Sequence, residues 1–306
     1  PWTFSRMAQT MDHLTKGRVG FNIVTGLNPG GLADNLGAEV REHDARYERA
    51  EEFMEVCYAL WQSWDSDALV RDKERSLFAD PKKVREVNYN GKHFQCRGPS
   101  QLPRSPQEIP VLFQAGQSPR GRQFAARHAE GVFTISPDLP AMQSYYRDVK
   151  DRLVNEGRRE SDLAILTGIF PIVGSSEAAA QEKYEQLVEL ATPEAGLAWC
   201  SGYASYNFAQ VPFDTKLSEL DPKDFAGIQS IFELTMASSS DAASLTPYLR
   251  AYPHVDEPTV RDLCVANAQS IVPKVVGTVA QVADRLRFVV LAELPPDLAA
   301  EAFLRV

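Results

Sequence analysis

The chain has 306 residues, of which 44% are hydrophobic, and a formal net charge of -9. This length can bury a core large enough for one α/β domain. The acidic balance, without a basic stripe, argues against a nucleic-acid partner, because phosphate backbones are bound by clustered Lys and Arg. The sequence contains neither a run of about eighteen uncharged apolar residues nor a signal-peptide pattern. We therefore expect no membrane contact and a cytoplasmic location.

The four cysteines lie far apart in the sequence, at Cys57, Cys96, Cys200 and Cys264. In a chain of this size that spacing predicts reduced core thiols rather than a disulfide framework. His93 and Cys96 have the spacing of metal ligands, but no second pair completes a set of four. We predict no metal site, with His93 lying in a hairpin.

The chain opens with a predicted helix from Trp2 that Lys16-Gly17 closes. Its apolar residues follow helical spacing, at Phe4, Met7, Met11 and Leu14. The first predicted strand is 18–25, RVGFNIVT, and a Gly-rich loop follows it.

Two polar residues stand out on this first strand, Asn22 and Thr25. Ligands bind at the carboxyl ends of strands in parallel α/β folds, so both are candidate ligand contacts. The alternative is that each side chain bonds to neighbouring backbone.

The strongest predicted helix is 43–64. Its apolar stripe consists of Phe53, Cys57, Leu60, Trp61 and Trp64, and the residues expected to face solvent are Glu48, Arg49, Glu51 and Glu52. Tyr47 lies one turn in from the start, where its phenol could reach over the strand ends; alternatively it packs with its hydroxyl in water. After this helix, 87–96 indicates a hairpin with Asn90-Gly91 as a type I′ turn, the centre of an insertion at about 86–98.

The segment 110–136 indicates a complete βαβ unit around which the chain is organised. Val111 to Phe113 form a short buried strand, and Gly116 ends it by allowing backbone angles that other residues resist. Ser118 is a good helix N-cap with Pro119 at the first helical position, and Gly131 is expected to stop the helix.

A helix that begins directly after a strand presents free N–H groups and a positive dipole end, so 116–121 could hold a phosphate. Arg120 and Arg122 add positive charge to the same corner. The alternative is an ordinary capped turn, because helix caps greatly outnumber phosphate sites.

The α/β alternation continues with a helix at 142–156, a strand at 163–173 and a helix at 176–190. From about 192 to 258 the pattern becomes irregular and aromatic, which suggests either a lid over an apolar pocket or a plain surface insertion. His254 in this segment is a candidate acid or base. Helices at 260–269 and 279–287 and a last strand at 288–291 complete the prediction.

Repeated strand-helix units without a Gly-x-Gly-x-x-Gly after the first strand favour a TIM-type barrel over an open sheet. Several ordered motifs along nearly the whole chain then resemble one family, the flavin-dependent monooxygenases of the bacterial luciferase-like superfamily. The resemblance is to the branch with nitrilotriacetate, EDTA, dibenzothiophene-sulfone and long-chain alkane monooxygenases. The matching motifs are 17–25 (GRVGFNIVT), 35–37 (NLG), Arg46-Tyr47 with Glu52-Phe53, 114–121 (QAGQSPRG), 128–130 with Val132-Phe133, and 276–278 with 282–284. Relatives usually have Ser where this chain has Gly26.

The resemblance implies a (β/α)8 barrel in a single domain over 1–306, with N-terminal strands absent from the given chain. It implies FMN, as FMNH2 from a separate NAD(P)H-dependent flavin reductase, which reacts with O2 to oxidise a small organic substrate. Xenobiotics, sulfones and aminocarboxylates are the substrate classes considered, and we expect a homo-oligomer because relatives commonly form one.

By position, the residues expected to contact the FMN phosphate are Ala115, Gly116, Ser118 and Gly121. Those expected near the flavin ring or ribityl chain are Asn22, Thr25 and Tyr47. No catalytic residue follows from the sequence. The alternatives are a deazaflavin-dependent oxidoreductase that transfers hydride, a non-catalytic flavin- or phosphate-binding barrel, and a phosphate-handling lyase.

Overall fold

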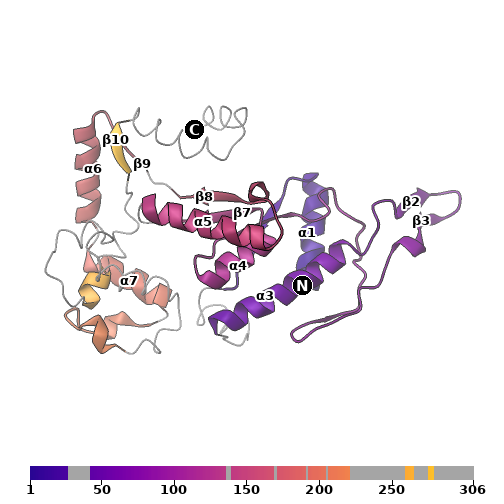
Figure 1. Cartoon of the computed structure of the whole chain (residues 1–306), viewed down its shortest axis with the longest axis horizontal. Coiled ribbons are helices and arrows are strands. Elements are labelled where there is room, and N and C mark those ends of the chain that lie inside the picture. Colours follow the sequence, from indigo (N-terminus) through magenta and orange to yellow (C-terminus); the bar gives the residue numbers. More distant parts are fainter. Residues whose placement is uncertain are drawn as a thin grey trace. The chain divides into compact units, whose positions relative to one another are not determined.

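The computed structural model describes residues 1–26, 42–135, 139–168, 171–190, 192–204, 206–220, 259–264 and 275–278 (Figure 1). The chain divides into two compact units. The first comprises Pro1–Thr25, Arg41–Phe133 and Tyr146–Leu166, and the second Gly26–Val40, Thr134–Tyr145 and Thr167–Val306.

The described helices and strands alternate through most of the chain. In order they are α1 (Trp2–Thr15), β1 (Gly20–Asn22), α3 (His43–Trp61), β2 (Leu69–Asp72), β3 (Leu77–Ala79), β4 (Tyr89–Asn90), β5 (Gln95–Cys96), β6 (Val111–Gln114), α4 (Pro119–His128), β7 (Gly131–Thr134), α5 (Leu139–Asn155), β8 (Ala164–Thr167), β9 (Pro171–Gly174), α6 (Glu177–Glu189), α7 (Pro193–Ala204) and β10 (Val275–Thr278).

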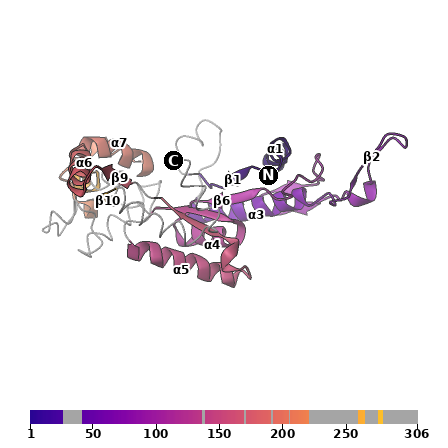
Figure 2. The ribbon, with the colours of Figure 1, turned by 90° about the horizontal axis from the view of Figure 1, so that it is seen from above.

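Among the described strands, the largest sheet has the order β1-β6-β7-β8. β6 pairs in parallel with both β1 and β7. Figure 2 shows α4 and α5 on one side of these strands. The predicted βαβ unit is therefore confirmed as β6-α4-β7, and the fold is α/β with a parallel sheet.

The core of the first unit joins α1 and α3 to this sheet. Its buried members are Ala8, Tyr47, Met54, Cys57, Trp61, Leu112 and Phe124. The predicted apolar stripe of α3 is largely buried, but the prediction that Glu51 and Glu52 face solvent is wrong, because each is only 9% exposed. Their carboxylates have partners inside the fold, which offset the cost of burying charge.

The first helix ends as predicted, with Lys16 in the left-handed conformation at φ 56°. Its apolar residues are divided between two faces. The Phe4 ring packs against Phe21 at a centroid distance of 5.3 Å, whereas Met7 and Met11 are exposed. The side facing the protein instead buries Asp12, which accepts hydrogen bonds from the backbone and side-chain amides of Gln107.

The hairpin insertion forms as β4 and β5, but its predicted turn is wrong. Neither Asn90 nor Gly91 has a positive φ, and the connection is the longer loop from Gly91 to Phe94. Glu52 holds this loop by accepting hydrogen bonds from the N–H groups of His93 and Phe94, at 2.9 and 2.6 Å. A Cβ on Gly91 would collide with that carboxylate, so the glycine is needed for the close approach.

Two further predictions change in the second half of the chain. The expected strand at 163–173 is two strands, β8 and β9, of which β9 pairs with β10 in a separate parallel pair. The segment expected to be irregular contains α7. The N-cap of α6 is confirmed, since the Ser176 Oγ accepts a hydrogen bond from the Ala179 N–H at 3.2 Å.

Several predicted features lie outside the described residues. They are the loop after the first strand with the 35–37 motif, His254, and the elements predicted at 279–291. All four cysteines are free thiols, and burial raises the pKa of Cys57 to about 12. No helix in the described part of the chain has the length and apolar character needed to cross a bilayer.

Candidate functional site

The turn from β6 into α4 forms the centre of the candidate site. Ser118 is the N-cap of α4, with φ -64° and ψ 156°, and Pro119 is the first helical residue. The Ser118 Oγ accepts a hydrogen bond from the Gly121 N–H at 3.0 Å. The predicted cap is confirmed, and the first turn of α4 directs backbone N–H groups beyond the carboxyl end of a parallel strand.

Gly116 and Gly121 pack directly against each other at this turn. A Cβ on Gly116 would lie 2.8 Å from the Gly121 Cα, and one on Gly121 would lie 2.9 Å from the Gly116 Cα. Gly116 is not among the described residues with positive φ, so the predicted reason for this glycine is wrong. Close backbone approach, rather than an unusual backbone angle, excludes a side chain at both positions.

Gly131 also has a role other than the predicted one. α4 ends at His128, and Ala129 already has extended backbone, with φ -90° and ψ 151°. Gly131 is the first residue of β7, and a Cβ there would collide with the Phe113 ring. The glycine therefore does not stop the helix; it allows β7 to lie close against β6.

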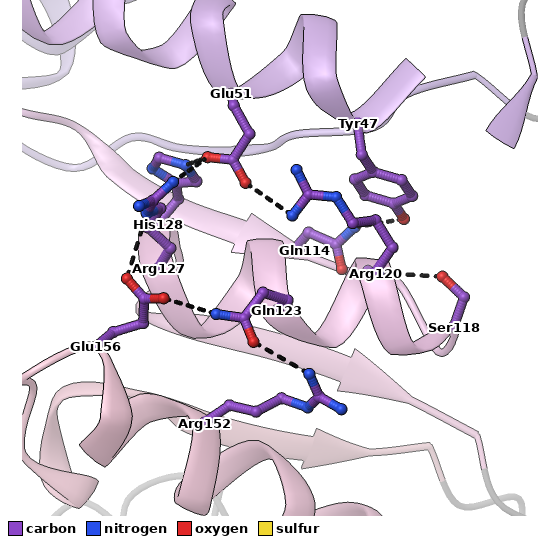
Figure 3. A network of polar contacts seen from close by, with 11 residues as sticks. Tyr47, Glu51, Gln114, Ser118, Arg120, Gln123, Arg127, His128, Arg152 and Glu156 are labelled. Atoms are coloured by element: carbon purple, nitrogen blue, oxygen red, sulfur yellow. Dashed lines mark hydrogen bonds and ion pairs between the residues drawn. The ribbon is translucent and has the colours of Figure 1, made fainter. Parts of the chain in front are cut away.

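Tyr47 is brought to the same turn from α3. Its side chain is buried, and its hydroxyl accepts a hydrogen bond from the Gln114 Nε2 at 3.4 Å (Figure 3). A Cβ on Gly121 would lie 2.7 Å from this hydroxyl. The alternative, a packed Tyr47 with its hydroxyl in water, is wrong, because this hydroxyl has a buried partner in Gln114.

The structure adds a residue that the sequence analysis missed, His43. Its Nε2 lies 3.1 Å from the Ser118 Oγ, and its Nδ1 lies 2.7 Å from the Asp44 carboxylate. The signal was present, because His43, Tyr47 and Glu51 are spaced four residues apart and so share one face of α3. That face lies along α4, with His43 near its first turn and Glu51 against its last turn.

The two arginines expected to add charge to the turn are paired with carboxylates. Arg120 forms an ion pair with Glu51 at 3.2 Å, and Arg122 forms one with Asp148 at 2.9 Å. The charges that were predicted to serve an anion are therefore largely balanced within the protein.

Glu51 is the hub of the polar network in Figure 3. Besides Arg120, its carboxylate meets Arg127 at 3.2 Å and the His128 Nε2 at 2.6 Å. Burial alone would raise the pKa of Glu51, but the hydrogen bonds and charges of His128 and Arg127 outweigh it and hold the pKa below its ordinary value.

A second set of contacts ties α4 to α5. The Gln123 side chain donates to Glu156 at 2.6 Å and accepts from Arg152 at 3.0 Å (Figure 3). The two sets together hold α4 between α3 and α5, which fixes the position of its first turn.

Asn22 and Thr25 lie at the corresponding end of the neighbouring strand. Asn22 is opposite Phe113 in the parallel register, and the Ile23 N–H donates to the Phe113 carbonyl at 2.8 Å. Thr25 therefore follows the carboxyl end of β1 just as Ala115 follows that of β6. The sheet brings these residues to one edge, as predicted, but the side chains of Asn22 and Ala115 are exposed and do not join the network.

The arrangement suits an anionic group. A glycine pair too close for side chains, a capping hydroxyl and the first N–H groups of α4 form a small cradle, and His43 and the Tyr47 hydroxyl border it. In the described part of the chain, no group of three or more His, Cys, Asp or Glu side chains is placed to hold a metal ion.

The family model described as luciferase-like monooxygenase matches residues 1–293. Among curated proteins, the chain is 40% identical over 289 residues to dibenzothiophene-sulfone monooxygenase of Rhodococcus erythropolis, covering 94% of this chain and 61% of that protein. A solved structure of a long-chain alkane monooxygenase superposes with a TM-score of 0.71 at 32% identity, over 95% of this chain and 59% of that one.

A structure of riboflavin lyase, described as containing modified FMN and substrate riboflavin, superposes with a TM-score of 0.76 at 32% identity, over 94% of this chain and 59% of that one. The chain thus spans about three fifths of the length of these relatives.

Proposed function

Since the chain belongs to the luciferase-like monooxygenase family, we propose that it is an FMNH2-dependent, two-component monooxygenase. A separate NAD(P)H-dependent flavin reductase supplies the FMNH2, and O2 and a small organic compound are the other substrates. The observation that carries the proposal is the convergence of Gly116, Ser118, Gly121 and Tyr47 on the first turn of α4.

The cradle at this turn fits the phosphate of FMN. Phosphate needs close backbone N–H donors and a hydroxyl, and the glycine pair lets a ligand approach the backbone of the turn. Ala115, Gly116, Ser118 and Gly121 hold the phosphate, and Tyr47 lies beside them. Asn22 and Thr25, at the end of β1, contact the ribityl chain or the flavin ring.

In this proposal the reduced FMN supplies the O2-activating chemistry, and the protein supplies binding, orientation and exclusion of water. The ion-paired network around Glu51 keeps α4 in place, so the phosphate is anchored at a rigid corner. β1 and β6 finish side by side next to this corner, and residues at their ends would hold the rest of the flavin.

The sheet β1-β6-β7-β8 forms part of a (β/α)8 barrel in a single domain over 1–306, with insertions at about 86–98 and 192–258. The solved structures that superpose over most of this chain support this proposal. We propose a homo-oligomer for the assembled enzyme. Among small organic substrates, sulfones are the first class to test, because the relative that is 40% identical is a sulfone monooxygenase.

Oxygen uptake tests the proposed activity. The protein is mixed with FMN, NADH and a flavin reductase, and O2 consumption and substrate loss are followed for sulfones, aminocarboxylates and alkanes. We expect oxidised product from at least one compound, in amounts that depend on this protein. If no compound is oxidised beyond the reductase-only control, while reduced deazaflavin supports hydride transfer to a carbonyl compound, the monooxygenase proposal is wrong.

A further inference from the structure

His43 is a polar side chain at the cradle to which neither the sequence motifs nor the proposed phosphate contacts assign a role. It is the first residue of α3, and its ring lies between a carboxylate and a hydroxyl. The Asp44 Oδ1 is 2.7 Å from Nδ1, and the Ser118 Oγ is 3.1 Å from Nε2. The positions of the hydrogens in this chain of contacts decide what Ser118 can offer a ligand.

The contact with Asp44 assigns a hydrogen to Nδ1 of His43. An ionised carboxylate is an acceptor only, so Nδ1 must donate to Asp44. The opposite neutral tautomer would place the Nδ1 lone pair 2.7 Å from a negative oxygen, which is repulsive. Neutral His43 therefore has a bare Nε2, which accepts the hydroxyl hydrogen of Ser118.

In that state Ser118 has no hydrogen left for a phosphate. Its oxygen already accepts from the Gly121 N–H at 3.0 Å, and its single hydrogen is directed at His43. Protonation of His43 reverses the second bond, because Nε2–H then donates to the Ser118 Oγ. The hydroxyl hydrogen is released and can point at a phosphate oxygen while the helix cap stays intact.

The charges around the cradle also favour a protonated His43 when a phosphate is bound. Arg120 and Arg122 are paired with Glu51 and Asp148, so the positive charge of each guanidinium is already largely balanced. From the described residues, the charged group against His43 is Asp44 of its own helix; the Tyr47 ring packs beside it at 5.1 Å, and α4 contributes Ser118. An imidazolium at position 43 adds a positive charge directly beside the cradle.

We propose that binding of the FMN phosphate at the α4 turn is coupled to uptake of one proton by His43, which frees the Ser118 hydroxyl to donate to the phosphate. The proton comes from the buffer acid, and the phosphate remains a dianion. The inference rests on the proposed function, since it requires FMN to bind with its phosphate at this turn.

The test is isothermal titration of the protein with oxidised FMN and, separately, with riboflavin. Titrations are run near pH 8, where a phosphate monoester with a second pKa of about 6 is already a dianion. Comparing buffers of different ionisation enthalpy gives the number of protons taken up. For wild type we expect net proton uptake on FMN binding, and over the pH range where the uptake approaches one proton per FMN the affinity should fall by about tenfold per pH unit. Riboflavin should bind more weakly and without proton uptake.

Three variants distinguish proton coupling from a merely structural role. His43→Gln keeps a neutral donor at the same reach and should abolish proton uptake and flatten the pH dependence. Asp44→Asn should reduce uptake, because the charge that favours the imidazolium is removed. His13→Gln, which alters an exposed histidine on α1, should behave as wild type. Thermal melting of each variant checks that it is folded.

The outcomes separate the two proposals. If FMN binds more tightly than riboflavin but wild type and His43→Gln take up equal numbers of protons, the coupling is wrong and the phosphate site stands. If FMN and riboflavin bind equally, or FMN does not bind, the phosphate site and the coupling both fail.

Discussion

At the scale of single residues, Ser118 has two roles: it caps α4, and we propose that it donates a hydrogen bond to a phosphate. Ser118→Ala removes both hydrogen bonds, so we expect FMN affinity to fall by about 1 to 2 kcal/mol, and helix stability by about 1 kcal/mol. Fluorescence titration with FMN measures the first effect and thermal unfolding the second.

The matched control is Ser176→Ala, which removes the equivalent cap from α6. It should cost similar stability and leave FMN binding unchanged. Equal FMN affinity of Ser118→Ala and wild type would sink the assignment of the phosphate to this hydroxyl.

Gly121 has no room for a side chain at the cradle. In Gly121→Ala the new Cβ would meet the Tyr47 hydroxyl at 2.7 Å and the Gly116 Cα at 2.9 Å, so the turn must shift. We expect a loss of about 1 to 3 kcal/mol in the free energy of unfolding, as for other overpacked sites. Denaturant unfolding provides the measurement.

Two variants locate the cause of that loss. Tyr47→Phe in the Gly121→Ala background removes one of the two close contacts and should recover part of the stability. Gly202→Ala places a methyl group where nothing lies within 4 Å and should not destabilise α7. A Gly121→Ala protein as stable as wild type would show that α3 and α4 are not packed as closely as described.

At the scale of elements, Glu51 connects α3 to α4, and its pKa in the folded protein is below its ordinary value of 4.5. The unfolded chain therefore binds this proton more readily than the folded one. The stabilisation is complete above about pH 4.5 and is lost as the pH falls through the folded pKa.

Glu51→Gln should lower the free energy of unfolding by about 3 kcal/mol at pH 7, because Arg127 and His128 lose a buried partner. The difference from wild type should shrink below about pH 4.5, as urea unfolding at a series of pH values would reveal. Glu55→Gln, an exposed position on the same helix, serves as the control. A difference that stays constant down to the acid limit would contradict the assignment to Glu51 ionisation.

Glu52 connects α3 to the hairpin β4-β5 through backbone N–H groups. Glu52→Ala should accelerate amide exchange at His93 and Phe94 by roughly 10- to 100-fold, since hydrogen bonds to a charged group are worth about 1.5 to 3 kcal/mol. Glu48→Ala removes side-chain contacts with Lys92 and the His93 ring but no hydrogen bond to the loop backbone, so it should leave those amides protected. Unchanged exchange in Glu52→Ala would mean that contacts other than the Glu52 carboxylate protect the His93 and Phe94 amides.

The local elements of the site were predictable because their signals are local. Ser118 and Pro119 mark the start of α4, and the apolar run before them marks β6. The burial of Glu51 and Glu52 was not predictable from helical periodicity, because it depends on partners far along the chain: His128 for the first and the hairpin amides for the second. The ion pairs of Arg120 and Arg122 were not predictable either, because their partners, Glu51 and Asp148, are also far away in the sequence.

At the scale of the whole molecule, alternating strands and helices predicted an α/β fold, and the parallel sheet β1-β6-β7-β8 confirms it. The resemblance of ordered motifs to luciferase-like monooxygenases is confirmed by the match over residues 1–293. The register between β1 and β6 brings motifs far apart in sequence to one edge of the sheet, since Asn22 ends β1 and Ala115 directly follows the neighbouring β6.

The central claim is that the first turn of α4 anchors the phosphate of FMN. A crystal structure of the protein soaked with FMN tests it most directly. We predict a phosphate oxygen within about 3 Å of the Ser118 Oγ and others within hydrogen-bond distance of the first N–H groups of α4. A structure with FMN bound and its phosphate held elsewhere, with the Gly116–Gly121 turn free of ligand, would contradict the claim.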